Sequence, residues 1–180
     1  MQMNGTIQIA REIMQRKELL AIAEQFATYN VQLSDEKESF EILNPYGKDA
    51  ILVESEGVLA SEPYIVCYTF YHIHLETVEQ VIAYVRDILE GRRLVIGFFK
   101  DGRWSMSADL DEQEMSDLSY TGLSKRMSMG KYGSDRPYGD HRELIEAADS
   151  FCVRGWAQDA DFDAVFVTDA QGVVTVHKSN

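Results

Sequence analysis

The stretch from Tyr64 to Leu110 constrains the fold most, because a long apolar run, a helix signal and a hairpin signal follow one another there. The run 64–76 is rich in aromatic and β-branched residues, which suit the pleated surface of a sheet. Alternate side chains of a strand share a face, so His72, His74 and Glu76 are expected on one side. We predict a central strand that is bent or ends early, because thirteen residues exceed the usual strand length.

A helix is predicted directly after this strand. Thr77 and Gln80 have the spacing of a capping box, in which each side chain binds the other's backbone amide. Apolar residues then recur at helical spacing over 78–89. Gly91 can supply the left-handed residue that ends a helix.

A hairpin is predicted next, because the Asp-Gly pair at 101–102 is the strongest two-residue turn signal. The register of such a turn puts Phe99 opposite Trp104, and it puts Phe98 and Ile96 on the other face. We expect the face of Phe99 to be in the core, with Trp104 as its largest side chain.

The remaining segments alternate between helix and strand signals. Helices are predicted at 6–29, at 112–118 and for about ten residues from Asp140, and strands at 39–43, 50–54, 151–158, 162–168 and 173–178. The fold class is therefore α+β, with a mostly antiparallel sheet of about seven strands and helices packed on one side. The length favours a single globular domain, residues 1–180, with a long loop or insertion at about 110–140.

The charge of the chain restricts its partners. The formal net charge is −13, from 30 acidic and 17 basic residues, which disfavours binding to nucleic acid or to an anionic membrane and favours a basic partner. No apolar run approaches the roughly 20 residues that span a bilayer, so a cytoplasmic location is expected. Cys67 and Cys152 are expected to be free thiols.

Two segments are candidate sites. On one strand face, His72 and His74 could bind a divalent transition metal together with Glu76, because imidazole and carboxylate groups are common ligands of such ions. An open position on that metal would hold an activated water, which would give hydrolase-type chemistry. The alternative is that the polar end of the strand simply faces solvent.

The second candidate is the locally basic, tyrosine- and glycine-rich segment 123–142. The predicted ligand-binding residues are Lys131, Tyr132, Arg136, Tyr138 and Arg142. Guanidinium groups and backbone amides next to glycine could bind a phosphate or carboxylate. The alternative is a basic surface loop that lies on the acidic body of the same molecule.

These observations favour a cytoplasmic, non-catalytic binding or regulatory domain that contacts a protein or a small anionic molecule through 110–140. No catalytic residue is assigned, and the common signatures of α/β-hydrolases, dinucleotide-binding proteins and nucleotide triphosphatases are absent from the sequence. One alternative is a metal-dependent hydrolase that uses the His-x-His-x-Glu pattern. A second alternative is an acidic immunity-type protein that binds a basic partner.

Overall fold

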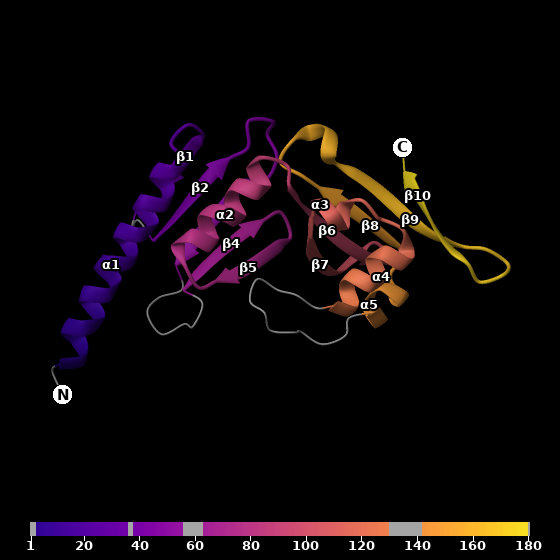
Figure 1. Ribbon diagram of the computed structural model, residues 1–180, viewed down its shortest axis with the longest axis horizontal. Coiled ribbons are helices and arrows are strands. Elements are labelled where there is room, and N and C mark those ends of the chain that lie inside the picture. The colour runs from indigo at the N-terminus through magenta and orange to yellow at the C-terminus, as the bar shows by residue number, and fades with distance from the viewer. Residues whose placement is uncertain (1–2, 36–37, 56–62, 130–141, 180) are drawn as a thin grey trace. The chain divides into compact units, whose positions relative to one another are not determined.

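The computed structural model describes residues 3–35, 38–55, 63–129 and 142–179 (Figure 1). The chain divides into two compact units, Met1–Arg86 and Asp87–Asn180, which are described separately. This division does not test the expectation of a single domain, which stays a prediction. In the described part of the chain, no helix combines the length and apolar character needed to cross a membrane.

The first unit contains a five-stranded antiparallel sheet in which the strands pair in chain order. Its elements are α1 (Met3–Gln25), β1 (Asn30–Leu33), β2 (Ser39–Leu43), β3 (Ile51–Ser55), β4 (Tyr64–Tyr68), β5 (Tyr71–Leu75) and α2 (Val78–Leu89), whose last turn lies beyond the unit boundary. The helix α1 packs against β2 and β3. Its Glu18 carboxylate accepts a hydrogen bond from the Tyr64 hydroxyl of β4.

Alternation along the strands separates a buried inner face from an outer face. The inner face carries Phe40, Ile42, Ile51, Val53, Tyr64, Val66, Tyr68, Tyr71, Ile73 and Leu75, all buried. The helices bury Leu19, Ile22, Ala23 and Phe26 from α1 and Val81, Tyr84, Val85 and Ile88 from α2. The outer face carries both polar and apolar side chains, among them Leu52, Glu54, Ile65 and His72.

The predicted long strand 64–76 is two strands joined by a tight turn at Thr69 and Phe70. Thr69 has a left-handed backbone with φ of 53°, which reverses the chain so that Tyr68 lies opposite Tyr71. Because the turn contains two residues, the side-chain alternation keeps Tyr71 on the inner face. The helix after it was predicted correctly: the Gln80 amide binds Thr77 Oγ1 at 3.2 Å, and Gly91 has φ of 73°.

The second unit contains another five-stranded antiparallel sheet, in the order β10-β9-β8-β6-β7. Its elements are β6 (Arg93–Lys100), β7 (Arg103–Asp111), α3 (Glu112–Met115), α4 (Tyr120–Met129), α5 (Arg142–Ala147), β8 (Ser150–Arg154), the 3-10 turn η1 (Gln158–Ala160), β9 (Phe162–Thr168) and β10 (Val174–Ser179). The α+β class is confirmed. The finer prediction of one sheet of about seven strands is not matched, because the described strands form two antiparallel sheets of five.

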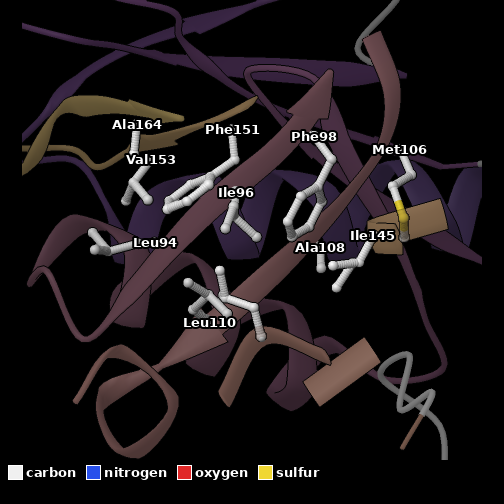
Figure 2. Packing of buried hydrophobic residues seen from close by; sticks show 11 residues of the cluster. Leu94, Ile96, Phe98, Met106, Ala108, Leu110, Ile145, Phe151, Val153 and Ala164 are labelled. Carbon is white, nitrogen blue, oxygen red and sulfur yellow. The ribbon is translucent and has the colours of Figure 1, made fainter. Parts of the chain in front are cut away.

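The core of the second unit lies on one face of its sheet (Figure 2). Its buried members are Leu94, Ile96, Phe98, Met106, Ala108, Leu110, Leu123, Ile145, Phe151, Val153 and Ala164. The expected core face of the β6–β7 hairpin is therefore wrong. The 101–102 turn forms as predicted and Phe99 pairs with Trp104, but Phe98 pairs with Met106, so Ser105 is an extra residue in a bulge. Trp104 is 55% exposed.

The described part of the predicted loop at 110–140 contains the two helices α3 and α4. Asp111 and Glu114 form a capping box at the start of α3. The helix α4 follows, and its Leu123 is part of the core of the second unit. Gly122 in α4 allows a close approach, because a Cβ there would lie 2.4 Å from the Asp117 carbonyl oxygen. Residues 130–141 lie outside the described part of the chain.

Candidate functional site

His72 and His74 lie side by side on the outer face of β5. Their ring centroids are 5.4 Å apart, and the ring planes are inclined at 74°. The His72 side chain is exposed and that of His74 is half-buried. This placement agrees with the period-two pattern of the sequence, which put both imidazoles on one side of the strand.

Glu76, the third proposed ligand, stays a prediction. It lies one residue beyond the end of β5, and its backbone amide donates to Gln80 Oε1 at 2.8 Å, as part of the start of α2. Among residues the structure describes, no three His, Cys, Asp or Glu side chains are grouped so as to hold a metal ion. The metal-dependent hydrolase stays a hypothesis, with two of its three proposed ligands adjacent.

Cys67 of β4 lies directly opposite His72 in the strand register. It is a free thiol and is half-buried. Burial raises the pKa of the Cys67 thiol, and the nearby Glu54 carboxylate raises it further. The thiol is therefore held in its protonated form, which is a poor metal ligand and a weak nucleophile.

The second predicted site falls mostly outside the described residues. Lys131, Tyr132, Arg136 and Tyr138 belong to 130–141, and Arg142 opens α5 with a side chain that is likewise outside the description. The phosphate or carboxylate site built on these residues stays a prediction.

A surface that sequence reasoning missed lies on the outer face of the second sheet. One row of side chains crosses all five strands in register: Trp104, Phe99, Ser150, Val165 and His177. Val167 follows Val165 on the same side of β9. We call these six residues the Trp104 strip. Trp104, Val165 and Val167 are 55%, 38% and 42% exposed, respectively.

The hairpin of β9 and β10 projects beyond its neighbour in the sheet. The strand β8 pairs with β9 only as far as Val165, whereas β9 and β10 pair on to Thr168 and Val174 (Figure 1). Val167 therefore lies on a part of the sheet that is two strands wide. Val173, in the turn between these strands, is also exposed.

The charges beside the Trp104 strip are paired with one another. The Asp149 carboxylate lies 3.7 Å from the Lys100 ammonium and accepts a hydrogen bond from the Asp101 amide at 2.8 Å. The pKa of Asp149 is lowered, chiefly by that backbone amide. Asp163 pairs with Arg154 at 2.7 Å. These two ion pairs give the strip a polar rim.

A buried ion cluster fixes the described part of 110–140 to the sheet. The Asp109 side chain is only 5% exposed and binds the guanidinium groups of both Arg93 and Arg126. Arg126 of α4 also lies 2.6 Å from Glu114 Oε1 of α3. Because these groups bind one another, the cluster joins α3, α4, β6 and β7 and has a structural role.

The first unit has an acidic groove with a volume of about 510 Å³. It is lined by Ser34, Asp35, Glu38, Ser39, Glu54, Ser55 and Ile65. The Glu38 carboxylate pairs with Arg16 at 2.8 Å. Among the described side chains, no cation lies within ion-pair distance of Asp35 or Glu54. Among the described residues, the lining of the groove thus has two carboxylates without an ion pair, Asp35 and Glu54.

Comparisons with known proteins do not assign the chain to a family. No protein-family model matches it, and neither a curated protein nor a solved structure does. The functional argument therefore rests on the residues and their geometry.

Proposed function

We propose that this chain is a non-catalytic binding domain that contacts a protein partner through the Trp104 strip. The observation that carries the proposal is the exposure of Trp104 in the same row as an exposed valine of β9. A large aromatic side chain held on a rigid hairpin, outside the core of its own unit, is typical of the residues that dominate protein interfaces.

The shape and chemistry of the strip fit such a contact. Phe99 and Trp104 lie in paired positions at one end, and the exposed Val165 and Val167 lie on β9, beyond Ser150 of β8. The paired charges of Lys100 and Asp149 lie at its rim. Exposed aromatic and aliphatic side chains bordered by polar groups are common in protein–protein interfaces.

The strip is a better candidate than the described part of 110–140. Leu123 is buried in the core, and Arg126 is only 10% exposed and is bound to Asp109. Both side chains therefore make their contacts within their own unit. Contact through Lys131, Tyr132 and Arg136 stays a separate prediction.

The proposal is tested by site-specific photocrosslinking in cells. A photoreactive amino acid replaces Trp104 in one variant and Tyr46 in a matched control, because Tyr46 is an aromatic residue of similar exposure, 57%, in the first unit. Crosslinked proteins are identified by mass spectrometry. We expect at least one protein that crosslinks at position 104 and not at position 46.

A second pair of variants then tests whether the contact uses the apolar surface. Val165→Lys and Val167→Lys place charge on the strip and should weaken binding of the crosslinked partner by about tenfold or more. Tyr46→Lys should leave the affinity unchanged. The proposal fails if nothing is specific to position 104, or if the lysine variants bind as well as the unmodified chain.

A second candidate function is binding of a basic partner at the acidic groove. The observation that favours it is the half-buried Glu54, which no described cation neutralises. Such a contact would be salt-sensitive, because the screening length falls from about 10 Å at 0.1 M to about 3 Å at 1 M salt. Glu54→Gln should weaken it, whereas Glu41→Gln, at an exposed position of β2 outside the groove lining, should not. Binding at the Trp104 strip should resist salt instead.

A further inference from the structure

The paired imidazoles of β5 are a feature that the proposed binding function does not use. His72 and His74 project from the same face, with Ile73 between them pointing into the core. In the sheet order, β5 is the last strand and pairs only with β4 among the described strands. The pair is thus at an edge of the first sheet.

The separation of the two rings suits a shared metal ion. A zinc–nitrogen bond is 2.0–2.1 Å in proteins, which puts the centre of each imidazole ring about 3 Å from the metal. Two rings at a tetrahedral angle around one ion are then about 5 Å apart. The observed centroid distance of 5.4 Å is close to this separation.

The described residues of one chain supply only two ligands of such a site. Zinc takes four ligands in structural sites, and the described residues offer no third His, Cys, Asp or Glu grouped with this pair. The Glu76 backbone is bound at the start of α2. Apart from the described residues of one chain, the remaining ligands can come from water or from another molecule.

A second copy of the chain can provide them. The order His-Ile-His reads the same in both directions, so a twofold axis at Ile73 would place His72 of one copy beside His74 of the other. An edge strand is the part of a sheet that another chain can approach most closely. Each copy has a formal charge of −13, so a cation between them would offset their mutual repulsion.

We propose that His72 and His74 from two copies of this chain together bind one divalent transition metal ion, such as Zn²⁺, and so link the copies at β5. The inference is independent of the Trp104 strip. It concerns binding, with no catalytic step.

The experiment uses the full chain, freed of any histidine tag, and ZnCl₂ alone. Isothermal titration calorimetry gives the stoichiometry, and light scattering after size-exclusion chromatography gives the mass with and without zinc. We expect one zinc ion per two chains, a doubling of mass on addition of zinc, and reversal by EDTA. His72→Ala and His74→Ala should each weaken zinc binding by about tenfold or more and abolish the mass change.

Two controls distinguish other sources of zinc binding. His177→Ala removes an exposed imidazole of the second unit and should change neither property. Cys67→Ser should also leave binding unchanged, and a loss there would show that the thiol is a ligand. The proposal would be overturned by a loss of zinc binding in Cys67→Ser. It would also be overturned if zinc bound at one ion per chain without a change of mass, or if the unmodified chain bound zinc no better than the histidine variants.

Discussion

The ion cluster at Asp109 allows a direct test of how α3 and α4 are attached to the sheet of the second unit. The substitution Asp109→Ala removes the carboxylate that binds both Arg93 and Arg126, while both guanidinium groups remain largely buried at 23% and 10% exposure. Burying these two charged groups costs desolvation free energy, and the removed carboxylate no longer offsets that cost.

The expected loss of unfolding free energy follows from the burial of these two arginine side chains. Removing one partner of a buried ion pair costs about 3–5 kcal/mol. Glu114 remains beside Arg126, at 2.6 Å, and compensates for part of the loss. We therefore expect a loss near the lower limit, about 3 kcal/mol in the free energy of unfolding.

The assay is urea unfolding followed by circular dichroism, with Asp163→Ala as the matched control. Asp163 is also an aspartate paired with an arginine, at 2.7 Å from Arg154, but its side chain is 60% exposed. An exposed pair contributes about 0–1 kcal/mol, so the control should change little. If Asp109→Ala destabilised the protein by no more than the control, the assignment of a buried, stabilising cluster would be refuted.

Two further predictions concern a tyrosine and a glycine. Burial, and then the hydrogen bond to Glu18, raise the pKa of Tyr64 above its ordinary 10.0. The contribution of this hydroxyl to the free energy of unfolding is therefore complete below pH 10 and is lost as the pH rises further. In a series of urea unfolding experiments at increasing pH, Tyr64→Phe should reduce this loss of stability at alkaline pH. Gly155→Ala puts a Cβ 2.6 Å from Ala160 Cβ and Leu94 Cδ2 and should cost about 1–3 kcal/mol in the same assay. An unchanged urea midpoint would contradict the close packing at Gly155.

The elements with local signals could be predicted from the sequence. The helix α2 starts at its capping box and ends at Gly91, since both signals depend on neighbouring residues. The strands 39–43 and 162–168 were also predicted at their observed bounds. Side chains alternate between the two faces of a strand, and this alternation correctly put His72 and His74 on the same side.

Features that depend on long-range pairing could not be predicted in the same way. Thr69 adopts a left-handed backbone that a β-branched residue rarely takes, so the turn between β4 and β5 gave no glycine signal. The strand β1, Asn30–Leu33, is short and mostly exposed, and none of its residues is fully buried. Without these two features, the division into two sheets was not visible in the sequence.

The Trp104 strip was missed because of one residue. Ser105 forms the bulge, and its hydroxyl donates to the Phe98 carbonyl at 3.1 Å. The bulge puts Met106 in register with Phe98 on the core side and leaves Trp104 paired with Phe99 on the opposite side. A regular hairpin register cannot show this shift, so the largest side chain of the hairpin was placed in the core.

The exposure of Trp104 is the claim on which the proposed function depends, and tryptophan fluorescence measures it directly. The chain has two tryptophans, and Trp156 is only 6% exposed, so Trp156→Phe leaves Trp104 as the sole reporter. We predict the emission of a water-exposed indole that acrylamide quenches readily and that a bound partner shields. Blue-shifted emission protected from acrylamide in the free protein would place Trp104 in the core and contradict the account.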